Sequence, residues 1–319
     1  MAVTTEAIGI PAPRVRRRWS DLFGPDIDGY GFILPAAIIM ICLVVYPFCL
    51  AVYFSMSDAW IGAENTHFIG LENFIYILTE DDIFRQTVRN TILFAVFSVL
   101  FKVIFGIAGA LLLMHVTKLK RLIRGAILIP FVAPTALTTL GWWLIFDPTY
   151  SQLNWFLQNV WPFSAMGLGP YQYLGDPNLA LASVIFVNIW RGLPFFIITI
   201  FAGLMAIPPS LYEAADIDGA TGSQKFWRIT LPLLRPVLAV IILFSTIFTL
   251  ADFNIVFVLT RGGPMNSTHL FATYSFMTGI GNREIGLGAA ISLFLFPLLF
   301  IIVIIQLRLV RKDAVYELS

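Results

Sequence analysis

The chain has 319 residues, of which 58% are apolar and 12% are charged, and its mean hydropathy is +0.84. Average soluble domains carry about 25% charged residues, so one soluble core cannot hide this much apolar surface. The composition also excludes a disordered, a collagen-like and a disulfide-stapled chain. A net charge of +1 excludes a global basic field for nucleic acid. We therefore predict an all-α, polytopic membrane protein.

Six apolar stretches are long enough to cross a bilayer, whose hydrocarbon core takes about 20 helical residues. In chain order they are residues 31–54, 91–116, 126–146, 179–207, 237–259 and 285–307. The only charged residues within them are Lys102, Arg191 and Asp252. The sequence predicts six transmembrane helices, some of them kinked by internal prolines that neighbouring helices can accommodate.

The lysines and arginines are distributed unevenly between the two sides of the membrane. Fourteen of the 20 fall on the side of the N-terminus and four on the other side, which places both termini in the cytoplasm by the positive-inside rule. The first 29 residues are polar and predict a cytoplasmic tail rather than a signal peptide. We expect four parts: tail 1–29, the first helix and outer loop 30–85, a five-helix core 86–308 and tail 309–319.

The second outer loop, residues 147–178, is rich in tryptophan, tyrosine and phenylalanine and has no lysine or arginine. Such a composition is typical of an aromatic belt at the membrane interface. A docking surface for an external partner is the alternative.

The chain lacks the motifs of nucleotide hydrolysis, metal binding and nucleophilic catalysis. It has no Gly-Lys dipeptide and hence no P-loop. Its histidines are too far apart in sequence to give metal-ligand spacing. Cys42 and Cys49 are seven residues apart, about 10.5 Å along a helix, which is too far for a disulfide. We expect no catalytic residue, no metal site and no enzyme activity in this chain.

The predicted cytoplasmic loop 207–236 holds the most informative local pattern. Ser210 followed by Glu213 has the spacing of a capping box, which predicts a helix that begins at Leu211. Gly219 is placed to end this helix in a left-handed conformation.

A second short helix is predicted to follow, capped by Thr221 with Gln224 and stopping near Pro232. Ala214 and Ala215 leave one side of the first helix flat, so that another surface can approach closely. An ordinary amphipathic helix at the membrane interface is the simpler interpretation of these local features.

This loop resembles the signature loop of ABC importer permeases at every fixed position. The matching residues are Glu213-Ala214-Ala215, then Gly219 after three residues, Ile229 after nine more, and Leu231-Pro232 after one more. Asp218-Gly219-Ala220 and Phe226 look like the maltose-type, carbohydrate subgroup. The resemblance covers roughly residues 30–310 and implies the type I ABC importer permease fold.

The resemblance implies that the loop is a coupling helix docked in a groove of a separate ATPase subunit. The residues expected to carry this contact are Glu213, Ala214, Ala215, Asp218 and Gly219. In such permeases the residue corresponding to Glu213 faces an arginine of the ATPase. ATP and magnesium are then bound by that partner, and this chain needs no cofactor of its own.

Polar residues in the fourth and fifth spans predict a substrate cavity, because the family holds its substrate on these two helices. They are Asn188, Arg191, Gly192, Phe195, Ser245, Thr249 and Asp252. Hydroxyls, an amide, charges and an aromatic ring suit the edges and faces of a sugar. Hydrogen bonding between the two helices is the alternative role. We also expect Arg191 and Asp252 to form an ion pair, either between the helices or beside the cavity.

The sequence therefore predicts a permease subunit of an ATP-driven importer that moves a sugar, such as a di- or oligosaccharide, into the cytoplasm. By resemblance, its partners are a second, related permease, two cytoplasmic ATPase subunits and an extracytoplasmic sugar-binding protein. Its expected location is the bacterial cytoplasmic (inner) membrane. The alternatives are an ion-coupled secondary transporter or channel that works alone, using Lys102, Arg191 and Asp252 as a relay, and a non-transporting membrane scaffold.

Overall fold

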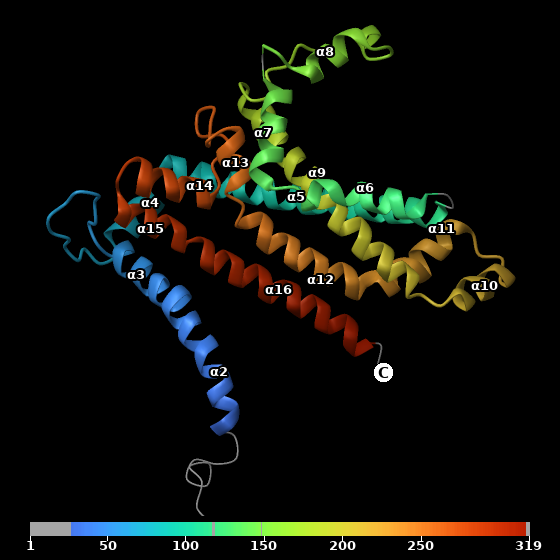
Figure 1. The fold of residues 1–319 in the computed structure, drawn as a ribbon, viewed down its shortest axis with the longest axis horizontal. Helices are drawn as coiled ribbons and strands as arrows, with labels where there is room; N and C mark the ends of the chain where they lie inside the picture. Colours follow the sequence, from blue (N-terminus) through green and yellow to red (C-terminus); the bar gives the residue numbers. More distant parts are fainter. Residues whose placement is uncertain (1–26, 117–118, 148, 317–319) are drawn as a thin grey trace, which may run out of the picture. The chain divides into compact units, whose positions relative to one another are not determined.

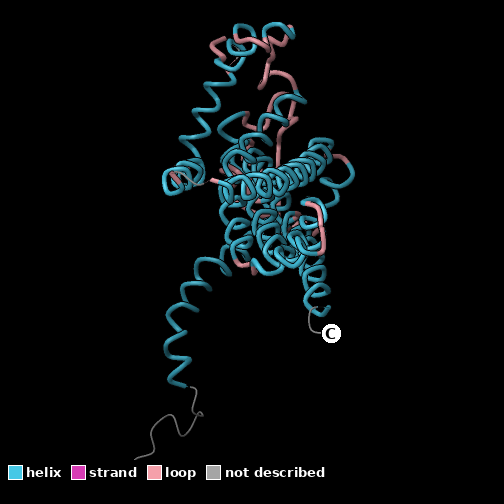
Figure 2. Tube along the Cα trace, turned by 90° about the vertical axis from the view of Figure 1, so that its right-hand side faces the viewer, coloured by secondary structure: helices cyan, strands magenta, loops and turns pink. Residues whose placement is uncertain are grey.

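The structure, a computed structural model, describes residues 27–116, 119–147 and 149–316. The predicted tail 1–29 falls almost wholly outside these residues, as does the end of the tail 309–319. Within the described ranges the secondary-structure elements are helices joined by loops, with one isolated antiparallel bridge between Ser57 and Phe68 (Figures 1 and 2). The chain divides between Ala51 and Val52 into two compact units.

The first unit contains α2 (Ile27–Met40), the π-helical turn η1 (Ile41–Val45) and the start of α3 (Tyr46–Ser55). The second unit contains the remaining helices. They are α4 (Glu72–Thr79), α5 (Asp82–His115), α6 (Lys120–Val132), α7 (Thr135–Phe146), α8 (Gln152–Asn159), η2 (Ser164–Met166), α9 (Pro177–Met205), α10 (Pro209–Ile217), α11 (Gly222–Lys225), η3 (Phe226–Thr230), α12 (Leu231–Leu250), α13 (Asn254–Leu259), α14 (Phe271–Phe276), η4 (Met277–Gly281), α15 (Ile285–Leu293) and α16 (Leu295–Tyr316).

Five continuous helical segments of the described chain are long and apolar enough to cross a membrane. They are Phe32–Ser55, Asp82–His115, Pro177–Met205, Gly222–Leu250 and Ile285–Arg308. A sixth span results if α6 and α7 are counted as one broken helix. The number of predicted spans therefore agrees with the structure when this broken pair is included.

The third predicted span is not one kinked helix but two helices at 90° to each other. The break lies at Ala133, which has extended backbone angles (φ −66°, ψ 144°) immediately before Pro134. A proline disfavours the helical conformation of the residue before it and lacks the N–H that would continue the helix. The sequence indicated the proline, but not that the two halves would turn by a right angle.

The fifth predicted span was also wrong in its bounds. It begins earlier, at Gly222, and ends at Leu250, so Asp252 lies in the break before α13 rather than inside a helix. The carboxylate of Asp252 accepts the backbone N–H of Ile255 at 3.1 Å. A side chain that accepts an N–H three residues ahead stabilises the start of the helix that follows, here α13.

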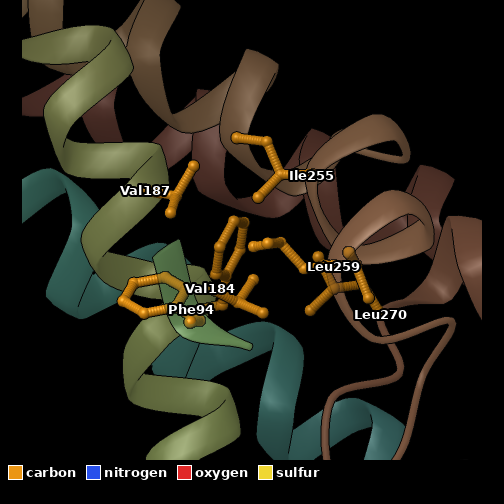
Figure 3. Packing of buried hydrophobic residues seen from close by; sticks show 8 residues of the cluster. Phe94, Val184, Val187, Ile255, Leu259 and Leu270 are labelled. Atoms are coloured by element: carbon orange, nitrogen blue, oxygen red, sulfur yellow. The ribbon is translucent and has the colours of Figure 1, made fainter. Parts of the chain in front are cut away.

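Helices α5, α9 and α12 pack against one another and form the centre of the second unit (Figure 1). Close approach of α5 and α9 depends on two glycines of α5. A Cβ at Gly106 would lie 2.7 Å from Cβ of Phe196, and one at Gly109 would lie 2.8 Å from Cδ1 of Ile197. Towards α13, Phe94, Val184, Ile255 and their neighbours form a buried cluster (Figure 3).

The loop between α13 and α14 contains a buried histidine. His269 is only 4% exposed, and its Nδ1 lies 3.3 Å from Oγ1 of Thr273. Gly262 makes room for the ring, because a Cβ at this position would collide with the imidazole. Its φ of +91° is also a backbone conformation that favours glycine. Burial lowers the pKa of His269 from 6.5 to about 4.

This histidine predicts a loss of stability in mild acid. The unfolded chain binds a proton at His269 below a pH of about 6.5, whereas the folded chain stays neutral down to about 4. The free energy of unfolding is therefore unaffected by this group above a pH of about 6.5. It falls by about 3 kcal/mol in all as the pH drops to about 4. Thermal unfolding of the purified protein across this window measures the loss. A His269→Gln variant with the same pH dependence as the unmodified protein would contradict this cause.

Candidate functional site

A cavity of about 380 Å³ lies between α9 and α12, with further lining from α5, from the α6–α7 pair and from the break after α12. Every residue that the sequence predicted for the substrate cavity contributes to its lining. These are Asn188, Arg191, Gly192 and Phe195 of α9, Ser245 and Thr249 of α12, and Asp252 of the break. Whether they contact a substrate stays a prediction, but the structure brings them together.

Asp252 is held by hydrogen bonds rather than by an ion pair. Its Oδ2 accepts the amide of Asn188 at 3.2 Å, and its Oδ1 accepts the N–H of Ile255. The ion pairs within 4.0 Å in the described part of the chain are Arg85–Asp82 and Lys225–Asp216. The predicted ion pair between Arg191 and Asp252 is therefore wrong: the carboxylate contacts the amide of Asn188 and the start of α13 instead.

Lys102 of α5 also lines the cavity, although the sequence did not assign it to the substrate site. It is 3% exposed, and its Nζ donates to Oγ1 of Thr249 at 3.2 Å and lies 3.5 Å from Oγ of Ser245. Gly192 leaves space for this side chain, since a Cβ there would lie 2.7 Å from Cε of Lys102. Its charge within an apolar span was the signal that could have assigned it to the cavity.

Two buried polar atoms of the cavity residues have no hydrogen-bond partner. They are Nε of Arg191, a donor, and Oδ1 of Asn188, an acceptor. Phe131 and Phe195 line the same cavity and stack on each other, with ring centroids 5.7 Å apart and planes at 16°. Free donors and acceptors next to flat apolar rings are what a site for a polyhydroxylated molecule needs.

The cytoplasmic loop predicted to couple the chain to a partner forms α10, a tight turn and α11. Helix α10 begins at Pro209, and Pro208 precedes it without a side-chain cap, so the predicted capping box of Ser210 and Glu213 is wrong. Proline is well suited to the first helical position, because a backbone N–H at that position would have no acceptor within the helix. The φ angle of proline is also already close to the helical value.

The end of α10 agrees with the sequence. Gly219 has a φ of +73°, its N–H donates to the carbonyl of Asp216, and the N–H of Ala220 donates to the carbonyl of Ala215 at 2.8 Å. This is the Schellman pattern that a left-handed glycine permits. Asp218 is the last residue before this glycine and is exposed.

The predicted second cap is confirmed, but the second helix is longer than expected. Thr221 and Gln224 form a reciprocal capping box at the start of α11. The helix then continues through the π-helical turn η3 and through α12 to Leu250 and does not stop near Pro232. Pro232 lies inside this continuous segment, shortly after the π-helical turn η3.

Contacts hold α10 against the helix that follows it. Nζ of Lys225 lies 2.6 Å from Oδ1 of Asp216, and the hydroxyls of Tyr212 and Thr230 are 3.0 Å apart. Glu213 and Ala214 are exposed and Ala215 is half-buried. The loop is thus a compact projection attached directly to the base of α12.

No group of three or more histidine, cysteine, aspartate or glutamate side chains that could hold a metal occurs in the described ranges. The arrangement can bind and guide a solute, but we identify no nucleophile with an adjacent base among the cavity residues described above.

A family model matches residues 102–313, which include the cavity, the coupling loop and α12. Its description is "Binding-protein-dependent transport system inner membrane component". The chain belongs to this family. It is therefore the membrane-spanning permease component of a binding-protein-dependent transport system, and the family to which it belongs is one of non-catalytic transport subunits.

Curated relatives of this permease span nearly its whole length. The trehalose/maltose transport system permease protein MalF of Thermococcus litoralis is 34% identical over 286 residues, 89% of this chain and 95% of its own. The sulfoquinovosyl glycerol transport system permease protein SmoG of Agrobacterium fabrum is also 34% identical, over 93% of this chain and 94% of its own.

A solved structure supports the fold. The crystal structure of a bacterial ABC transporter involved in the import of the acidic polysaccharide alginate superposes with a TM-score of 0.77. The match covers 92% of this chain and 98% of the other at 23% sequence identity. The same kind of transporter has been solved with a periplasmic protein bound to an alginate pentasaccharide. The all-α importer-permease fold predicted from the sequence is confirmed.

Proposed function

We propose that this permease moves a sugar into the cytoplasm through the α9–α12 cavity, driven by ATP that a separate subunit hydrolyses. Its curated relatives are permeases for trehalose and maltose, sulfoquinovosyl glycerol and diacetylchitobiose. The observation that carries the proposal is the gathering of Asn188, Ser245, Thr249 and Asp252 around one cavity, where they offer hydrogen bonds to hydroxyl groups.

The proposal assigns the coupling role to the projection that contains Glu213, Ala214, Ala215, Asp218 and Gly219. Its geometry supports this role, because an exposed helix fixed to the base of α12 can transmit a movement to the residues that line the cavity. ATP-driven closure of the partner subunits would shift α10, and α12 would follow. Such a shift changes the transport cycle only if ATP binds the two arrangements of the complex with different affinity.

The same proposal includes the assembly and its location. The working complex contains this chain, a second related permease, two cytoplasmic ATPase subunits and an extracytoplasmic sugar-binding protein. It lies in the bacterial inner membrane with both termini of this chain in the cytoplasm. ATP and magnesium are bound by the ATPase subunits, and this chain has no catalytic activity and holds no cofactor.

Reconstitution in proteoliposomes tests the proposal. With the full set of partners, the binding protein outside and ATP inside, labelled sugar accumulates; this chain alone accumulates none, with or without an ion gradient. Uptake by this chain alone on a proton or sodium gradient would favour the ion-coupled carrier instead. Uptake that the full complex carries out without ATP would also contradict the proposal.

A further inference from the structure

The α9–α12 cavity has an excess of positive charge. Its ionisable lining residues are Lys102, Arg191 and Asp252, two basic groups and one carboxyl group. In a site of low dielectric, such an imbalance favours a ligand that supplies the missing negative charge.

Neither cation has a carboxylate in contact, since the ion pairs of the described residues lie elsewhere, at Arg85–Asp82 and Lys225–Asp216. The hydrogen-bond partners of Lys102 are two hydroxyls, although only 3% of the residue is exposed. The Nε of Arg191 is buried without a partner. Buried charges are normally paired, because leaving an ion without a counter-ion is costly.

The carboxylate in the cavity is engaged elsewhere. Both oxygens of Asp252 accept hydrogen bonds, one from Asn188 and one from the N–H of Ile255. The same contact leaves Oδ1 of Asn188, a residue only 5% exposed, without a donor. The cavity thus offers two basic side chains without a contacting carboxylate and, separately, one free acceptor.

We propose that the cavity takes an anionic sugar, one that carries a carboxylate, phosphate or sulfonate group, and that Lys102 is a specificity-determining residue. The anionic group lies against Lys102 and Arg191, and a sugar hydroxyl donates to Oδ1 of Asn188. This inference rests on the proposed function, because it assumes that the transported sugar enters this cavity.

The charge predicts a measurable preference. A single hydrogen bond to a charged group corresponds to an affinity ratio of about 10- to 100-fold. An anionic sugar should therefore bind that much more tightly than a neutral sugar of the same size. The affinity ratio between the anionic and the neutral sugar should fall less steeply with rising salt than it would at an exposed site, because buried charges are screened less.

The test is equilibrium binding to the full permease–ATPase complex in lipid nanodiscs, without the binding protein, which would impose its own selectivity. The probes are maltose, its counterpart with one glucuronic acid unit, maltose phosphate and a sulfonated glucoside, so that the anionic groups are compared directly. We expect at least one anionic probe to bind about 10-fold or more tightly than maltose, and Lys102→Met to abolish that ratio.

Arg89→Met is the matched control. Arg89 is an exposed cation of the same helix that lines a different cavity, so its removal should leave the ratio unchanged. The affinity ratio between the anionic probes and maltose is also measured on the unmodified complex. The test therefore remains valid if the Lys102→Met variant does not fold. Maltose binding as tightly as every anionic probe would overturn the inference and leave the proposed function standing. Failure of the intact transporter to accumulate any sugar with ATP would overturn both.

Discussion

Replacing Glu213 with lysine should abolish ATP-driven sugar uptake while leaving the permease folded in the membrane. Glu213 is exposed on α10, and the described structure gives it no ion-pair partner within 4.0 Å, so its loss costs the isolated chain little. In the assembled transporter the change places a lysine where the proposal has a carboxylate facing a basic group. Truncating one member of a buried interfacial charge pair costs about 2–5 kcal/mol, and charge reversal adds repulsion.

The measurement is uptake together with the amount of ATPase subunit that co-purifies with the permease. We expect uptake to fall by about 30-fold or more, in step with the loss of ATPase. Glu80→Lys is the matched control, because Glu80 is an exposed carboxylate at the end of α4, far along the chain from the coupling loop, and should leave both quantities unchanged. Normal uptake by the Glu213→Lys complex would contradict the coupling role of the loop.

Replacing Asp252 with alanine should damage both stability and transport. The change leaves the amide of Asn188 and the N–H of Ile255 without their acceptor. A buried donor left unsatisfied costs about 1–3 kcal/mol. The substitution also removes the one carboxylate that lines the cavity, beside Lys102 and Arg191. We expect a lower unfolding temperature and uptake reduced about 10-fold or more, the equivalent of 1.4 kcal/mol or above.

Asp252→Asn separates the two effects. Asparagine keeps an oxygen for the N–H of Ile255 but removes the charge, so the unfolding temperature should stay near that of the unmodified protein. The net charge of the cavity rises by one, and an anionic sugar should bind more tightly. Because Asn188 and Asp252 share a hydrogen bond, the effects of Asn188→Ala and Asp252→Ala should not add. Additive effects, or unchanged uptake in Asp252→Ala, would assign these residues to packing alone.

Features that depend on neighbouring residues in the sequence could be predicted. Apolar length alone identified the spans, because crossing a bilayer requires a stretch of about 20 apolar residues whatever the tertiary structure. The left-handed Gly219 and the Thr221–Gln224 cap were also predicted, since both are set by residues within one turn. The Ser210–Glu213 cap was wrong because Pro209 competes for the same helix start.

Features that depend on a choice between distant partners could not be predicted. The sequence placed Arg191, Asn188 and Asp252 around one cavity, as the structure does, but it paired the carboxylate with Arg191 rather than with Asn188, the other α9 side chain. Lys102 comes from a third helix, and its contact with Thr249 depends on how α5 packs against α12. The right-angle break before Pro134 likewise depends on tertiary packing, because a proline within a span is compatible with a simple kink.

The most direct test of the account is a photo-crosslinking amino acid at Ala214 in the assembled transporter. Ala214 is exposed on the coupling projection, so a probe there reports what this surface touches. We predict a covalent adduct with the ATPase subunit whose yield changes when ATP is added. A transporter that still accumulates sugar while the probe at this position labels only lipid or water would contradict the account.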